Sequence, residues 1–190
     1  MEILDSGARV EFDSGAVRDI KEGKGRCDLL PLDVFTLIEY RTDVDTAIEK
    51  EMKPYSSISM TGRIFIAIER YKETLNTKYL SYAAREFISY SMTLTGLTSS
   101  YIWIDLSKHY EEGAKKYADR NWQKGIPVHS FIDSATRHLI KFIDNWDDEP
   151  HDRAFLWNIV GAIWTHMHRP DLIDINLCDI LDNEEKTNDR

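Results

Sequence analysis

The chain has 190 residues and a formal net charge of −9, with 42% hydrophobic and 30% charged residues. This length favours one domain, in which folding buries about 70% of the extended chain's surface, so no disulfide is needed for stability. The acidic balance argues against a nucleic-acid-binding protein, which normally carries a basic face, but a local basic cluster would still suit a phosphorylated small molecule.

The first 31 residues are predicted to form an irregular arm, because four glycines and Pro31 interrupt them. The middle of this arm is basic, although the chain as a whole is acidic. Its basic residues are Arg18, Lys21, Lys24 and Arg26. The arm therefore supplies the local positive charge that a phosphorylated ligand needs.

Beyond the arm, apolar residues recur at spacings of three and four, which predicts helices. The predicted helices cover residues 32–52 with a break near 41–43, then 60–75, 78–90, 103–120, 130–145 and 150–168. Residues 121–128 are predicted to be a loop, and the polar end of the chain is expected to fray.

One stretch is ambiguous: residues 93–103, TLTGLTSSYIW, suit either a short strand or a cap for the following helix. No second strand pairs convincingly with it, and strands do not alternate with helices. The predicted fold is therefore all-α, a helical bundle of five to seven helices with an irregular basic N-terminal arm.

Residues 109–127, HYEEGAKKYADRNWQKGIP, contain the first candidate site. Glu112 and Lys116 share one helix face, which a solvated ion pair would also explain. Asn121 and Trp122 precede a Gly-Ile-Pro turn, where an aromatic ring and an amide could stack on a purine and hydrogen-bond to it. Alternatively, Trp122 fills the core.

Residues 131–145 contain the second candidate site. Arg137 and His138 are adjacent, and both side chains donate hydrogen bonds to phosphate oxygens. The alternative is that Arg137 pairs with Asp133, four residues earlier, while His138 lies in the wall of the core.

Residues 147–164 contain the third candidate site. Asp148, His151 and Asp152 lie at a predicted helix start, where the helix dipole favours carboxylates in any case. Asn158 follows two turns after His151, inside an apolar run where its amide must find hydrogen-bond partners. A buried Asn facing His151 and an acidic cluster suits a metal site or a water-positioning site.

Two other motifs are poorly matched. His138 with His151-Asp152 is similar to the histidine–aspartate set of HD-type phosphohydrolases, but a distal Asp is missing. The segment EGKG lacks the full Walker A pattern, so a P-loop nucleotide site is not expected.

Four segments occurring in order resemble one family. They are SGAVRDIKEGKGRCDLLP, YEEGAKKYADRNWQKGIP, DSATRHL and DDEPHDRAFLWN. Together they are similar to the N-terminal domain of phage dATP/dGTP diphosphohydrolases, the MazZ group, which is related to the all-α MazG-like nucleotide pyrophosphohydrolases. The resemblance covers about 75 residues, divided between the arm and residues 109–165.

The resemblance implies hydrolysis of a purine deoxynucleoside triphosphate to the monophosphate and pyrophosphate. It also implies Mg²⁺ or Mn²⁺ as cofactor and a homo-oligomer. The implied substrate-binding residues are Arg18, Lys24, Arg26, Lys116, Asn121, Trp122, Lys124, Arg137 and His138. The implied catalytic residues are Glu112, His151 and Asn158. In the arm, the glycines would let the backbone approach the triphosphate; alternatively, ion pairs pin the arm to an acidic body.

The sequence departs from the MazG pattern in its carboxylates. MazG-type enzymes carry Glu-Glu-x-x-Glu on one helix and Glu-x-x-Asp on the next, whereas here Lys115 follows Glu111-Glu112 in place of the third Glu. The spacing suggests a metal set of Glu112, Asp148 and Asp152. A second hypothesis follows, in which the protein is a catalytically weak phage protein that binds and sequesters a nucleotide.

The middle segment, residues 35–108, has no counterpart in the resemblance. It would be an insertion within a single domain of residues 1–190, one that covers the site or builds an oligomer interface. Arg63, Glu69, Arg85 and Glu86 from this segment are candidates to join the site.

Cys27 and Cys178 lie far apart and lack metal-binding spacing, as expected of reduced thiols. No apolar run reaches the roughly 18 residues that a membrane span needs, and the N-terminus lacks a signal-peptide pattern. We expect a cytoplasmic protein, in the host cytoplasm if phage-encoded, that contacts neither membrane nor nucleic acid.

Overall fold

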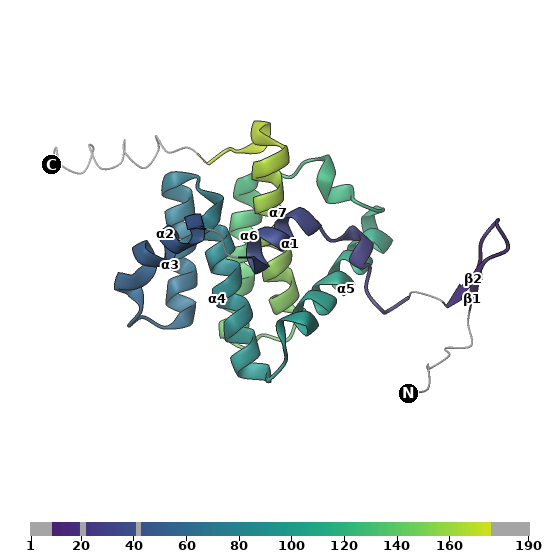
Figure 1. The fold of residues 1–190 in the computed structure, drawn as a ribbon, viewed down its shortest axis with the longest axis horizontal. Coiled ribbons are helices and arrows are strands. Elements are labelled where there is room, and N and C mark those ends of the chain that lie inside the picture. Colours follow the sequence, from purple (N-terminus) through teal and green to yellow (C-terminus); the bar gives the residue numbers. More distant parts are fainter. Residues whose placement is uncertain (1–8, 20–21, 41–42, 176–190) are drawn as a thin grey trace.

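The computed structural model describes residues 9–19, 22–40 and 43–175 (Figure 1). These residues form an all-α bundle with one small two-stranded sheet, which confirms the predicted fold class. The helices are α1 (Leu32–Glu39), α2 (Asp43–Met52), α3 (Met60–Thr74), α4 (Thr77–Thr95), α5 (Ser99–Tyr117), α6 (Val128–Ile143) and α7 (His151–His168). Short 3₁₀ turns are η1 (Cys27–Leu29), η2 (Lys53–Tyr55), η3 (Asn121–Lys124) and η4 (Pro170–Leu172). Cys178 lies outside the described residues.

Helix α7 forms the centre of the bundle and contacts α1, α4, α5 and α6 (Figure 1). Its sequence is apolar on most sides, as expected for a helix surrounded by others. Gly161 allows the closest approach, because a Cβ atom there would lie 2.4 Å from the ring of Phe131 on α6. The positions of the site residues on α6 and α7 therefore depend on this tight contact.

The middle segment contributes to the same core. Tyr71 on α3 and Phe87 on α4 are fully buried, and they join one hydrophobic cluster with residues of α6 and α7. The ring of Phe87 lies 4.4 Å, centroid to centroid, from that of Phe155 on α7. Helices α3 and α4 are thus core elements and support the helices that carry the candidate site.

The N-terminal arm is more regular than expected. Strands β1 (Arg9–Glu11) and β2 (Val17–Asp19) pair antiparallel, with Val10 opposite Arg18. Between them the chain reverses through Gly15, whose φ of +79° is readily adopted only by glycine. The prediction of an irregular arm missed this hairpin because a valine beside polar residues is a weak strand signal.

The ambiguous stretch at residues 93–103 forms the end of α4, a three-residue connection and the start of α5, so the strand alternative is wrong. Helix α4 continues to Thr95 and ends at Gly96, which adopts the left-handed conformation usual for a helix C-terminus. Thr98 then precedes α5 as its N-cap residue, although its side chain makes no capping hydrogen bond. In the part of the chain that the structure describes, no helix is both long and apolar enough to cross a bilayer.

Candidate active site

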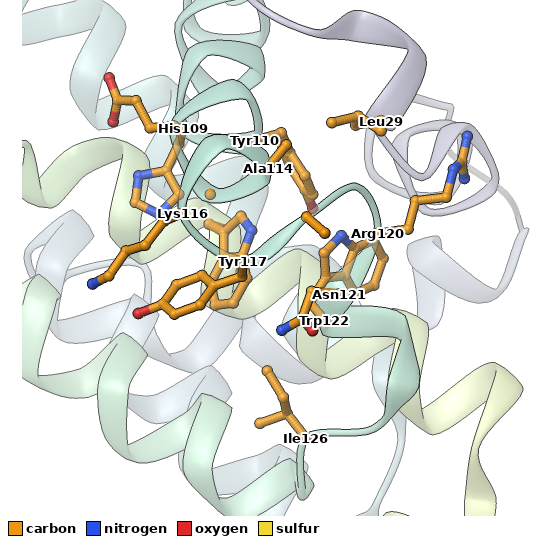
Figure 2. Close-up of a pocket in the computed structure, with 14 residues that line it drawn as sticks. Leu29, His109, Tyr110, Ala114, Lys116, Tyr117, Arg120, Asn121, Trp122 and Ile126 are labelled. Carbon is orange, nitrogen blue, oxygen red and sulfur yellow. The ribbon is translucent and has the colours of Figure 1, made fainter.

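A cavity of about 530 Å³ lies between the C-terminal half of α5 and the η3 turn (Figure 2). Its walls are mostly aromatic and apolar. They are formed by Leu29, His109, Tyr110, Glu112, Gly113, Ala114, Lys116, Tyr117, Ala118, Arg120, Asn121, Trp122, Ile126 and Trp157. The size and the few polar groups are typical of a small-molecule site.

The chain bends sharply where it leaves α5 for this cavity. Ala118 has a φ of +78° and Arg120 a φ of +55°, values that are uncommon for residues with a Cβ atom. The bend turns η3 back so that Asn121 and Trp122 face the end of α5 (Figure 2). Unfavourable backbone conformations of this kind concentrate at functional sites.

Trp122 belongs to both the core and the cavity. It is 7% exposed, and its ring packs edge-on against Trp164 at 4.8 Å between centroids and against Tyr110 at 5.8 Å. Its indole nitrogen, the Tyr110 hydroxyl and Nδ1 of His109 are buried and make no hydrogen bond with any described residue. Such groups are costly in a purely structural wall, so a polar partner is expected there.

A second group of side chains joins the end of α6 to the start of α7. His151 is 3% exposed, and its Nδ1 lies 3.0 Å from Nδ1 of His138. An oxygen of Glu149 lies 3.5 Å from His138 Nδ1 and 3.7 Å from His151 Nδ1. Among the described residues, these three side chains form a group whose donor atoms all lie within 4.8 Å of one another, as a shared cation requires.

Asp148 connects this histidine cluster to Lys141. One carboxylate oxygen lies 2.7 Å from His151 Nε2 and the other 2.6 Å from Lys141 Nζ. The hydrogen bond from Lys141 and then that from His151 lower the pKa of Asp148. Asp148 therefore remains ionised and orients the His151 ring.

His109 lines the cavity. Burial lowers its pKa, and the positive charge of Arg153 lowers it further. The charges of His138 and Glu149 also act on the pKa of His109. Burial is likewise the main cause of the lowered pKa of His138. Both imidazoles are therefore predominantly neutral at pH 7.

The predicted metal set of Glu112, Asp148 and Asp152 is divided among three surroundings. Glu112 accepts a hydrogen bond of 3.2 Å from Arg153, and Asp148 contacts Lys141 and His151. Asp152 lines a separate, smaller cavity. Helix spacing places residues on one side of a helix but does not determine which neighbouring helix they meet; here Arg153 lies beside Glu112.

Asn158, predicted to be catalytic, is 5% exposed and donates a hydrogen bond of 2.8 Å to the Ala154 carbonyl of its own helix. The hydrogen-bonding capacity of its amide is therefore partly satisfied within α7 itself. His151, the other predicted catalytic residue of α7, lies in the histidine cluster.

The predicted phosphate-binding residues are also dispersed. Arg137 is paired with Asp133, as in the alternative to phosphate binding that the sequence offered. His138 belongs to the histidine cluster. Lys116 lines the aromatic cavity and stands 4.8 Å from the centre of the Tyr117 ring. Lys124 is exposed, and its carbonyl accepts a hydrogen bond from Arg169.

In the arm, the glycine amides bind a carboxylate of the chain itself. Gly23 and Gly25 donate hydrogen bonds of 2.8 and 2.9 Å to the two oxygens of Glu111. Arg26 pairs with Asp28 and Asp119. These contacts match the alternative in which the arm is pinned to an acidic body, while Arg18 and Lys24 remain exposed.

Sequence reasoning overlooked four residues of this region: His109, Glu111, Glu149 and Arg153. His109 could have been found, since it shares a helix face with Glu112 and Lys116 at spacings of three and four. Glu149 follows Asp148 at the start of a predicted helix, where the helix dipole favours carboxylates in any case, so it gave no separate signal. Of the candidates from the middle segment, Arg63 and Glu86 pair at 2.7 Å and line another cavity.

Residues 91–175 match the family model described as dATP/dGTP diphosphohydrolase, N-terminal, which confirms the family resemblance. The matched range contains α5, α6 and α7, and with them the histidine cluster and all but Leu29 of the cavity wall. The N-terminal arm lies outside it. No curated protein and no solved structure matches the chain.

Proposed function

We propose, from the membership of residues 91–175 in the dATP/dGTP diphosphohydrolase N-terminal family, that this protein hydrolyses purine deoxynucleoside triphosphates to the monophosphate and pyrophosphate. One observation supports the proposal most strongly. The matched helices carry an aromatic cavity and a group of side chains that could hold a cation, and α7 contributes residues to both.

The cavity suits the purine base. Tyr117 and Trp122 offer aromatic surfaces on which a flat, apolar ring system can stack, while Asn121 offers an amide for hydrogen bonds at its edge (Figure 2). Stacking of a base on an aromatic side chain contributes about 1–3 kcal/mol. Stacking in the cavity therefore supplies part of the binding free energy of a purine nucleotide.

The triphosphate would extend from the cavity toward α7. Lys116 and Arg153 supply positive charge on this path, and neutral His109 donates one ring hydrogen. Arg153 is now shared between Glu112 and Asp105, so substrate phosphates would compete with these carboxylates for it.

The reaction adds water to the α-phosphorus and breaks its bond to the oxygen that bridges to the β-phosphate. A divalent cation would neutralise the triphosphate and stabilise the charge that develops as this bond breaks. His151, whose ring Asp148 orients, is one of three side chains, with His138 and Glu149, that could hold this cation.

The decisive experiment measures pyrophosphate release from each dNTP and NTP with Mg²⁺, with Mn²⁺ and with a chelator. We expect release from dGTP or dATP that the chelator abolishes. Tight nucleotide binding in calorimetry without release in any metal would instead support the sequestering protein. Neither binding nor release would overturn both hypotheses.

A further inference from the structure

The histidine cluster has the features of a prepared metal site. His151 is held by two contacts of different kinds: its Nε2 faces a carboxylate oxygen of Asp148, and its Nδ1 faces His138 and Glu149. In the imidazole tautomer whose Nε2 hydrogen is donated to a carboxylate, Nδ1 carries the lone pair. This lone pair points into the group formed by the other two donors.

Asp148 acts here as the outer carboxylate of a carboxylate–histidine–metal arrangement. Its second oxygen is occupied by Lys141 at 2.6 Å, so it is engaged away from the three donors. In this arrangement Asp148 orients a ligand, whereas the sequence suggested that it is a ligand itself.

We propose that His138, Glu149 and His151 bind a first-row transition-metal ion, of the Mn²⁺ or Zn²⁺ class, in preference to Mg²⁺. Imidazole nitrogen suits these ions, whereas Mg²⁺ prefers oxygen ligands and water. Two nitrogens and one carboxylate oxygen leave further coordination positions for water and substrate, as in catalytic sites.

The distances agree with this assignment. Ligand atoms about 2.1 Å from a common ion lie about 3.0 Å apart at right angles and about 3.4 Å apart in a tetrahedron. The observed separations are 3.0 Å between the two nitrogens, and 3.5 and 3.7 Å from them to the Glu149 oxygen. Small movements of Glu149, whose side chain is 45% exposed, would complete the set.

The competing arrangement is a hydrogen bond in which Nδ1–H of His138 donates to Nδ1 of His151. It accounts for the 3.0 Å separation of the nitrogens without any metal. In that case Glu149 would contribute little to holding the two rings together, because its oxygen lies 3.5 and 3.7 Å from their Nδ1 atoms. The role of Glu149 therefore distinguishes the two arrangements.

The test titrates the purified full chain with Co²⁺, which reports nitrogen and oxygen coordination through its visible absorption. We expect one Co²⁺ per chain, displaced by Zn²⁺ but not by millimolar Mg²⁺; Mn²⁺, which binds nitrogen ligands more weakly than Co²⁺, should displace it only in large excess. Glu149→Gln should weaken binding at least tenfold, whereas Asp147→Asn, an exposed carboxylate two residues earlier, should not change it. His138→Gln should abolish the spectrum.

Nitrogen-15 spectra of the histidines provide the second measurement. Zn²⁺ should shift Nδ1 of both His138 and His151, and circular dichroism establishes that each variant is folded. Absence of saturable Co²⁺ binding, or equal affinity in wild type and Glu149→Gln, would overturn the proposal and leave the histidine hydrogen bond.

The inference concerns the cation of the proposed hydrolase and in that sense rests on the proposed function, but binding is measured without substrate. Pyrophosphate release supported by Mg²⁺ in a protein that binds no Co²⁺ would refute the metal site alone. Selective Co²⁺ binding without turnover of any nucleotide would refute the hydrolase alone.

Discussion

Glu111 and Glu112 are adjacent and chemically identical, yet the fold gives them opposite roles. Glu111 is buried against the arm and accepts two backbone hydrogen bonds. Glu112 is 60% exposed, lines the cavity and meets Arg153. The difference arises because successive residues on a helix point about 100° apart.

We expect Glu111→Gln to destabilise the protein by about 1–2 kcal/mol at pH 7, because hydrogen bonds to a charged acceptor are stronger than neutral ones. The amides of Gly23 and Gly25, which donate to Glu111, lower its pKa. The stabilisation is therefore present above the unfolded pKa of 4.5 and is lost as pH falls through the lower folded pKa.

Urea unfolding of wild type and Glu111→Gln from pH 3 to 7 measures this contribution. The two should differ at pH 7 and converge as the pH approaches 3. Glu69→Gln, which removes an exposed ion pair with Lys72, serves as control and should change stability by less than about 0.5 kcal/mol. A constant difference across this range would contradict the assigned role.

At the scale of elements, one of the contacts between the arm and α5 is a close approach at Gly25. A Cβ atom on Gly25 would lie 2.0 Å from the Ser107 hydroxyl oxygen, whereas one on Gly15 would meet nothing within 4 Å. Both glycines have positive φ, so alanine is unfavourable at either site by about 1–2 kcal/mol.

Gly25→Ala should therefore release the arm, but Gly15→Ala should affect only the hairpin turn. Hydrogen exchange is the measurement: the amides of residues 22–30 should lose protection in Gly25→Ala while α5 keeps its own. Unchanged protection of these amides in Gly25→Ala would show that the arm accommodates the side chain.

The pairing of α6 with α7 permits a second matched comparison. Gly161→Ala would force a methyl group into the Phe131 ring, which should cost about 1–3 kcal/mol. Gly113→Ala, in the interior of α5 with open space around it, should stabilise the helix by about 0.5–1 kcal/mol. Thermal or urea unfolding should show changes of opposite sign; equal changes would mean that α6 and α7 can separate slightly.

At the scale of the whole molecule, the cavity lies against α5 and α7, the histidine cluster lies on α6 and α7, and α3 and α4 support these helices. A purine nucleotide that bridges them should stabilise the folded protein by about 2.7 kcal/mol at a concentration of 100 Kd. A nonhydrolysable dGTP analogue should accordingly raise the melting temperature.

Tyr117→Ala should weaken binding of this analogue about tenfold, because Tyr117 lines the cavity and is 56% exposed, so its removal spares the core. Tyr40→Ala, at a tyrosine that is 67% exposed and lies outside the cavity, is the control and should bind like wild type. Calorimetry measures both affinities. Equal loss in the two variants, or loss in neither, would place the base elsewhere.

The sequence by itself determined the all-α class and approximate bounds of most helices, because apolar spacing along a chain is a local property that burial then enforces. The predicted break near residues 41–43, which corresponds to the boundary between α1 and α2, followed from the same pattern. The cavity-lining residues Lys116, Asn121 and Trp122 were found for a similar reason, since they lie close together in one segment.

Only the tertiary structure decided which distant side chains meet. In the folded chain His138 lies beside His151 and Glu149. A glycine amide of the arm donates a hydrogen bond to Glu111, and Arg153 pairs with Glu112. Such contacts depend on how helices cross and on where a tight glycine contact such as Gly161 sets their separation. Residue spacing within one helix contains no information about that geometry.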